Sequence, residues 1–164
     1  MGLAWVHHFA GRHQEVVREV LDILALRPGL EEANNVLITS LESLGRFEEA
    51  ASRMRGVRCW GIQLDGDALL AAWRSGGPVG YWRERLAQML RMDSTRQTFG
   101  YALAAAHVEL GEYEAAMDYL DAMVDAHIGS CVFLGVDPVL ASMRGMPRFD
   151  AIVRRIGVPL LQTV

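Results

Sequence analysis

The sequence contains no lysine, so all 16 of its basic side chains are arginines. Any cationic contact with a partner must therefore come from a planar guanidinium. The formal net charge is -4, whereas a nucleic-acid partner requires a basic face, so nucleic-acid binding is disfavoured. No apolar run reaches the length of a membrane span, and the first residues lack the basic region and apolar core of a signal peptide. These absences predict a cytoplasmic protein with no membrane partner.

Cysteine is also scarce. Cys59 and Cys131 lie far apart, and neither belongs to a CxxC pair or to a cysteine–histidine spacing typical of a metal site. Two buried free thiols in a reducing compartment are favoured over a disulfide. A chain of 164 residues, 51% hydrophobic and 22% charged, can bury roughly 70% of its unfolded surface. The length therefore suits one domain, which needs neither a metal ion nor a disulfide to fold.

What the sequence does contain is a repeated glycine motif. The string GRHQEV at Gly11 recurs in form as GRFEEA at Gly45 and as GEYEAA at Gly111. The first two copies are 34 residues apart, and the next two are 66 apart, nearly two such periods. Gly77 lies 32 residues after Gly45 and 34 before Gly111, where a middle copy is expected. A period of this length indicates a helical repeat protein.

Each of these glycines is predicted to end one helix just before another begins. Glycine adopts a left-handed backbone without penalty, which suits the end of a helix. The ring two residues later, Phe47 or Tyr113, can pack across the turn. The small residue five positions after the glycine, Ala50 or Ala116, lets the two helices approach closely, and a large side chain there would cost ~1–3 kcal/mol. Apolar residues at three- and four-residue spacing flank these turns and predict amphipathic helices.

These residues resemble the motif of the tetratricopeptide repeat (TPR) family. The match runs through Leu37, Leu41, Gly45, Phe47 and Ala50, again through Leu103, Gly111, Tyr113 and Ala116, and Pro28 falls where the first repeat should close. The resemblance covers about residues 1–127 and implies an all-α fold, a right-handed α-α superhelix of the TPR-like solenoid type. The repeats are expected at about residues 1–30, 31–62, 63–94 and 95–128 of a single helical-repeat domain, residues 1–164.

Two copies depart from the family pattern. Val16 replaces the small alanine of the first copy. In the weak third copy, Leu69 and Trp73 fit the first helix, and residues 75–80 form the turn. Trp82 then stands where a small residue is expected, which predicts wider or shifted packing there.

The last part of the chain does not repeat the motif and is predicted to cap the stack. Asp137 followed by Pro138 is a helix N-cap with proline in the first turn. Pro147 is expected to open a second short helix that Gly157 and Pro159 end. Its buried stripe is predicted at Phe149, Ile152, Val153 and Ile156. Because the final repeat of a solenoid exposes an apolar face, residues 132–159 are predicted to form C-terminal capping helices.

Both ends of the chain raise expectations about neighbouring parts. The C-terminal tail is similar in style to TPR regions of bacterial multidomain regulators, in which another module precedes the repeats. Met1 falls partway along the first helix of the first repeat, so that Leu3, Val6 and Phe9 would lack a neighbour. Either an upstream domain or a second molecule is expected to cover that face.

The sequence shows no constellation typical of an enzyme. Metal ligands on a helix prefer i and i+4 positions, whereas His7 and His8 point in different directions and His13 lies beyond a turn. Solvated or partly packed histidines are therefore favoured over a metal or ligand site at His7 and His8. His107 fits a core histidine, and His127 a cation at a helix end. We expect no catalysis, no cofactor and no metal.

In a TPR superhelix the first helix of each pair lines a concave groove. The resemblance places these partner-binding residues there: Trp5, His8, Asn35, Thr39, Glu42, Asp67, Ala71, Arg74, Tyr101, Ala105 and Val108. They lie off the predicted buried stripes, so they would be available to an extended peptide or a partner helix. Of the tryptophans, Trp5 is the candidate contact, whereas Trp60, Trp73 and Trp82 are predicted to lie in the core.

The expected function is a non-catalytic scaffold that binds a protein or peptide. One TPR subgroup clamps a C-terminal carboxylate with lysines and asparagines, but the matching places here hold Met1, Trp5 and Val36. A neutral to mildly basic peptide is expected instead, because the lining has Glu42 and Asp67 against one arginine. The alternative is a self-association module, a homodimer through the N-terminal helix.

Overall fold

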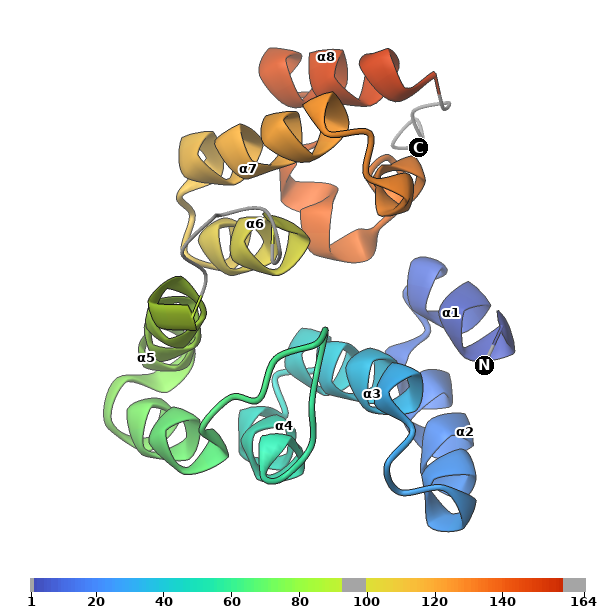
Figure 1. Cartoon of the computed structure of the whole chain (residues 1–164), viewed down its shortest axis with the longest axis vertical. Coiled ribbons are helices and arrows are strands. Elements are labelled where there is room, and N and C mark those ends of the chain that lie inside the picture. Colours follow the sequence, from blue (N-terminus) through green and yellow to red (C-terminus); the bar gives the residue numbers. More distant parts are fainter. Residues whose placement is uncertain (1, 93–99, 158–164) are drawn as a thin grey trace. The chain divides into compact units, whose positions relative to one another are not determined.

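The computed structural model describes residues 2–92 and 100–157 of the chain (Figure 1). Within these residues the fold is all-helical and no strand occurs, which confirms the predicted all-α class. The chain divides into two compact units, residues 1–89 (unit 1) and residues 90–164 (unit 2). None of the described helices is both long and apolar enough to cross a bilayer.

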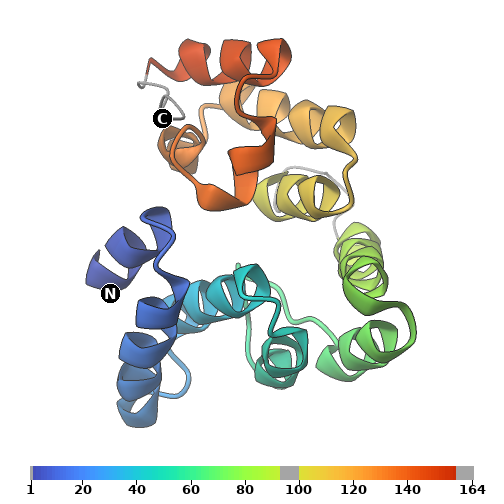
Figure 2. The ribbon, with the colours of Figure 1, turned by 180° about the vertical axis from the view of Figure 1, so that it is seen from behind.

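Unit 1 is a succession of packed helices. It contains α1 (Gly2–Phe9), α2 (His13–Leu26), α3 (Glu31–Ser43), α4 (Phe47–Met54) and most of α5 (Gly66–Met92). Each helix from α1 to α4 packs against the next, and α1 also reaches α3, as Figure 2 shows from behind. Fully buried side chains from these four helices form the core: Ala4, Val16, Val20, Ala33, Val36, Ala50, Ala51 and Met54.

Three turns share one backbone geometry. Gly11, Gly45 and Gly111 have φ angles of 69°, 70° and 74°. Each glycine N–H donates to the carbonyl O three residues earlier at 2.9 Å, and the following N–H donates to the carbonyl O five residues earlier at 2.8 Å. This pair of bonds is the Schellman motif, which satisfies carbonyl groups left over at a helix end. In each case the next helix begins two residues after the glycine.

The residue five positions after each glycine is fully buried. This holds for Val16, Ala50 and Ala116, each with no exposed surface. Valine in the first copy is therefore accommodated in the core. In each of the three pairs the two helices are joined by the same turn, and the same position of the second helix is buried.

The turn expected near Gly77 is present but has another geometry. The element α5 consists of two helices joined at Gly77, where φ is 60° and ψ is -149°. Pro78 follows, and a proline is tolerated in the first turn of a helix because its missing N–H needs no partner there. A β-carbon on Gly80 would lie 2.4 Å from the carbonyl O of Ala72. The two halves of α5 therefore approach closely at a point where only glycine fits.

Unit 2 also has one core. It contains α6 (Gly100–Glu109), α7 (Tyr113–Asp125), η1 (Gly129–Phe133), η2 (Pro138–Met143) and α8 (Pro147–Ile156). The helices α6 and α7 pack as a pair, α8 packs against α7, and the short 3-10 helix η2 packs against α6. Buried residues from all of these elements join in the core: Ala104, Val108, Ala116, Met117, Leu120, Cys131, Leu134, Leu140, Met143, Phe149, Ile152 and Val153.

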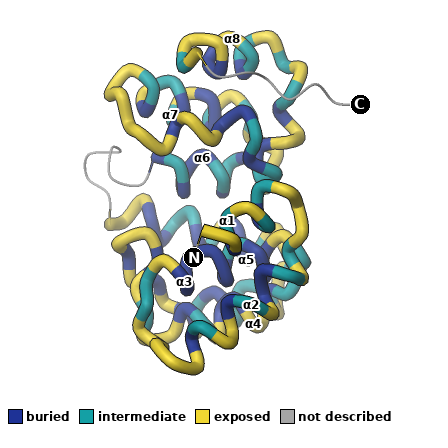
Figure 3. Tube along the Cα trace, turned by 90° about the vertical axis from the view of Figure 1, so that its right-hand side faces the viewer, coloured by how far each residue is buried: buried dark blue, intermediate teal, exposed yellow. Residues whose placement is uncertain are grey.

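Three predicted helix boundaries are confirmed in the C-terminal part, at Pro138, Pro147 and Gly157. The first short helix begins at Gly129, before the predicted start at residue 132, and Pro159 lies outside the described residues. The Asp137 carboxylate accepts a hydrogen bond from the Val139 N–H at 2.9 Å, although the element that it caps is a 3-10 helix and not an α-helix. Pro147 opens α8, and Gly157 ends it with φ 77°. Figure 3 shows the exposed outer side of α8 and the buried side that it turns toward α7.

Candidate functional site

The predicted partner-binding residues are divided between the two units, from Trp5 to Arg74 in unit 1 and from Tyr101 to Val108 in unit 2. Four of them are buried: His8, Asn35, Glu42 and Val108. The prediction that these positions lie off the buried surface is wrong for those four. Val108 belongs to the apolar core of unit 2, and the other three are held by contacts within unit 1.

Glu42 is the centre of a buried polar cluster. The Tyr81 hydroxyl donates a hydrogen bond to Glu42 Oε1 at 2.5 Å, and Arg85 Nη1 donates to the same oxygen. The side chains of Glu42 and Arg85 are 4% and 6% exposed. The Arg85 guanidinium also lies 5.1 Å from the ring centroid of Trp82. Glu42 therefore joins α3 to the second half of α5 and is not available to a partner.

The buried surroundings of this cluster also shift the pKa values of Tyr81, Cys59 and Arg85. Burial raises the pKa of Tyr81 well above its usual value, and the Glu42 carboxylate adds to the effect. Burial likewise raises the pKa of the Cys59 thiol to about 12, against a smaller opposing effect of Arg85. Burial alone would lower the pKa of Arg85, but the attraction of Glu42 outweighs it and the pKa is raised. At neutral pH the cluster holds one ion pair, a neutral phenol and an unreactive thiol.

Asn35 fixes the loop between α4 and α5. Its Oδ1 accepts a hydrogen bond from the Trp60 backbone N–H at 2.8 Å. Trp60 has φ 55°, in the left-handed region that residues with a β-carbon seldom adopt. Cys59 and Ile62 exchange backbone hydrogen bonds around it, at 2.7 and 2.9 Å. The loop therefore holds Trp60 in a conformation that it would not adopt by itself.

Trp5 is half-buried and belongs to an aromatic cluster. Its indole Nε1–H donates to Glu32 Oε1 at 3.2 Å. Its ring centroid lies 6.0 Å from that of Trp60, 5.8 Å from Phe9 and 5.5 Å from His8. Trp60 is 36% exposed, so its predicted place in the core is wrong, whereas Trp82 is buried as predicted. A positive φ at tryptophan has no sequence signal, and for this reason sequence reasoning missed this contact.

In unit 2 the predicted groove residue Tyr101 forms a hydrogen bond with the C-terminal elements. Its hydroxyl donates to Asp137 Oδ2 at 2.5 Å, so the same carboxylate that caps η2 also contacts α6. Arg144 Nη2 donates to the Asp137 carbonyl O at 3.0 Å. Tyr101 is half-buried by this arrangement. The Tyr101 hydroxyl thus forms an internal hydrogen bond of unit 2.

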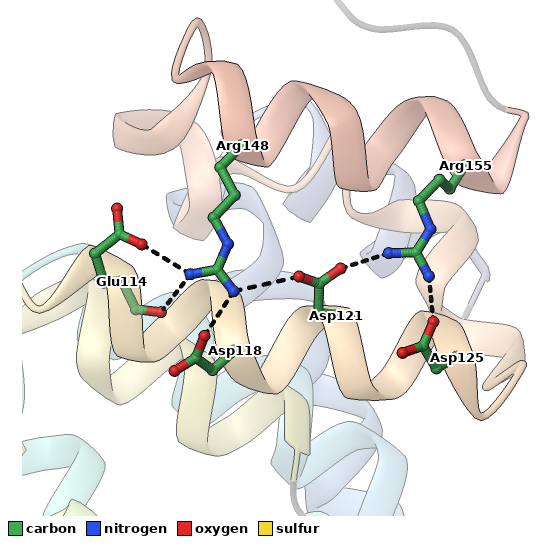
Figure 4. A network of polar contacts seen from close by, with 6 residues as sticks. All are labelled: Glu114, Asp118, Asp121, Asp125, Arg148 and Arg155. Carbon is green, nitrogen blue, oxygen red and sulfur yellow. Dashed lines mark hydrogen bonds and ion pairs between the residues drawn. The ribbon is translucent and has the colours of Figure 1, made fainter.

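A ladder of ion pairs joins α7 and α8 (Figure 4). Arg148 Nη1 lies 2.7 Å from Glu114, and its Nη2 lies 2.6 Å from Asp118 and 3.3 Å from Asp121. Arg155 pairs with Asp121 at 2.5 Å and with Asp125. The hydrogen bonds that Arg148 donates to Asp118 and Glu114 raise its pKa. Because most of these side chains are well exposed, each ion pair of the ladder contributes little to the stability of unit 2.

Five of the predicted groove residues in unit 1 are half-buried or exposed: Trp5, Thr39, Asp67, Ala71 and Arg74. Asp67 pairs with Arg55 at 2.5 Å, and Arg74 pairs with Glu48 at 3.2 Å, all four side chains being exposed. Thr39 is half-buried, and its hydroxyl donates to the Asn35 carbonyl O at 3.0 Å. These exposed pairs are the type that a charged partner can replace, because each contributes little to folding.

His7 and His107 lie in ordinary polar contacts with neighbouring side chains. His7 Nδ1 accepts from Arg12 Nε at 2.9 Å, and its Nε2 lies 3.9 Å from Glu19. The half-buried His107 has its Nδ1 2.7 Å from Glu112 and its ring stacked on Tyr119. Among residues 2–92 and 100–157, no three His, Cys, Asp or Glu side chains form a group that could hold a metal ion.

No protein-family model matches this chain, and neither a curated protein nor a solved structure matches it.

Proposed function

We propose that the chain is a non-catalytic protein-binding module of the TPR type, whose helix pairs stack as a right-handed superhelix and bind a peptide or partner helix. The supporting observation is the recurrence of one Schellman turn at Gly11, Gly45 and Gly111, each followed by a helix with a fully buried fifth residue. Repeated helix pairs of this kind present extended surfaces that are used for binding.

A displayed peptide library tests this function without knowledge of the natural partner. Selected peptides would be titrated into the isotope-labelled chain, with backbone amide shifts as the readout. The expected footprint lies on the first helices of the pairs, α1, α3, the first half of α5 and α6. A footprint on the second helices α2, α4 and α7, or a selection without specific binders, would contradict the proposal.

Self-association is the second candidate function. Leu3 and Val6 on α1 are 59% and 56% exposed, and they lie three residues apart on one face of the helix. A second copy would bury this face, as expected for a homodimer through the N-terminal helix. Light scattering over a range of concentrations should then show a dimer that the Leu3→Glu, Val6→Glu variant lacks. A monomer at every concentration removes this candidate.

A further inference from the structure

The aromatic surface formed by Trp5 and Trp60 is bordered by two carboxylates. Glu31 Oε1 accepts the Gly61 N–H at 2.6 Å, and Glu32 Oε1 accepts the Trp5 indole N–H at 3.2 Å. Both glutamates stand in the first turn of α3 and keep part of their surface exposed. Glu32 is thus fixed beside the Trp5 indole, and Glu31 beside the backbone that follows Trp60. The centroids of the Trp5 and Trp60 rings lie 6.0 Å apart, with an interplanar angle of 54°.

This surface carries the electrostatic features that attract a cation. The face of an indole ring is negative and attracts a guanidinium or ammonium group. The carboxylate that accepts the Trp5 N–H adds a full negative charge at the edge of that ring. Arg58, one of two arginines in the loop, donates from its Nη2 to the Gly61 carbonyl O at 2.7 Å. Arg58 is thus engaged with the backbone of the loop, while the Glu32 carboxylate lies at the edge of the Trp5 ring.

The loop backbone holds Trp60 at the surface beside Trp5. Its φ of 55° is one that residues with a β-carbon seldom adopt. The hydrogen bond to Asn35 and the Cys59–Ile62 bridge hold the backbone there, with 36% of the Trp60 surface exposed. The Trp60 ring is thus partly open to solvent at 6.0 Å from the Trp5 ring.

We propose that Trp5, Trp60, Glu31 and Glu32 form a binding site for an arginine side chain presented by a partner peptide. A planar guanidinium can lie on an indole face while its N–H groups donate to a carboxylate at the edge of that ring, which an ammonium cannot do in the same way. The proposal rests on the proposed function, because it names the side chain of a partner peptide that would bind at the α1 end of the proposed binding surface.

The test is an NMR titration of the full chain with the peptide acetyl-Gly-Arg-Gly-amide and with its citrulline counterpart, a neutral side chain of the same shape. The indole N–H resonances of Trp5 and Trp60 should shift with the arginine peptide, while that of the buried Trp82 should not. Citrulline should bind about tenfold more weakly. Equal binding of the two peptides, or no shift of either indole at millimolar peptide, overturns the proposal.

Charge variants separate the site from a general effect of net charge. The Glu31→Gln, Glu32→Gln variant keeps an acceptor oxygen for Gly61 and Trp5 but removes both charges, and it should weaken arginine binding about fivefold. The control Glu48→Gln, Glu49→Gln makes the same charge change on α4 and should bind as the unmodified chain does. Equal weakening in both variants overturns the proposed site.

The library selection distinguishes failure here from failure of the proposed function. If the selected peptides shift amides of α3 and α6 but not the indole resonances of Trp5 and Trp60, the binding module is supported and the arginine site is refuted. If the library yields no binders but arginine binds specifically at the two indoles, the arginine site is supported and the proposed peptide-binding groove is refuted.

Discussion

The buried pair of Glu42 and Arg85 allows a quantitative expectation. In the Glu42→Leu variant the Arg85 guanidinium stays buried with only the Trp82 ring as its favourable neighbour. Removing one partner of a buried ion pair costs about 3–5 kcal/mol of folding free energy. The Tyr81 hydroxyl also loses its acceptor, which costs a further ~1–3 kcal/mol. We therefore expect this single substitution to be among the most destabilising in unit 1.

Replacing the whole cluster should cost much less. In the triple variant Glu42→Leu, Tyr81→Phe, Arg85→Met, no buried charge or hydroxyl remains without a partner. Apolar replacement of a complete buried ion pair is often neutral or stabilising by about 1–4 kcal/mol. We expect the triple variant to lie within about 2 kcal/mol of the unmodified chain, far from the single variant.

Tryptophan fluorescence during urea denaturation is the suitable assay, because all 4 tryptophans lie in residues 1–89 and report on unit 1 alone. The control is Glu48→Gln, which removes an exposed ion pair with Arg74 and should cost less than about 1 kcal/mol. If Glu42→Leu costs no more than this control, or if the triple variant is as unstable as the single one, the role assigned to the cluster is wrong.

Three further expectations concern other parts of the chain. Gly111→Ala should cost roughly 1–2 kcal/mol because its φ is 74°, whereas Gly129→Ala should be near neutral; equal urea midpoints by circular dichroism would contradict this. Because burial raises the pKa of Cys59 from 9.0 to about 12, its contribution to folding stability is complete below pH 9.0 and is lost as the pH rises toward about 12. The Cys59→Ala variant should lose less stability over this range, and identical pH slopes of the two chains would contradict this. Arg148→Met should destabilise unit 2 by about 1 kcal/mol more than Arg154→Met, a difference that high salt should reduce; no difference at low salt would show the ladder to be unimportant.

The helix ends were predictable from the sequence because they depend on local backbone chemistry. A left-handed residue after an amphipathic helix favours glycine, and the Schellman bonds at Gly45 and Gly111 join residues at most five positions apart. The same reasoning located Pro147 and Gly157 at the two ends of α8. The different turn at Gly77 was harder to predict from the sequence, because it belongs to a place where two helices approach closely, at Gly80.

The candidate site was much less predictable because it depends on distant partners. Glu42 was assigned to a surface, yet the tyrosine and arginine that bury it follow 39 and 43 residues later. Trp60 was assigned to the core, yet a hydrogen bond from its backbone to Asn35, 25 residues earlier, holds it at the surface. A helical period shows which residues share a face, but not which later segment covers that face.

The proposed stacking of the helix pairs is tested most directly within unit 1, by residual dipolar couplings of its backbone amides. We predict that a single alignment tensor fits the couplings of α1 to α4, because each of these helices packs against the next. If the pair α1–α2 and the pair α3–α4 require tensors of different magnitude or orientation, the two pairs move independently and the proposed stacking is contradicted.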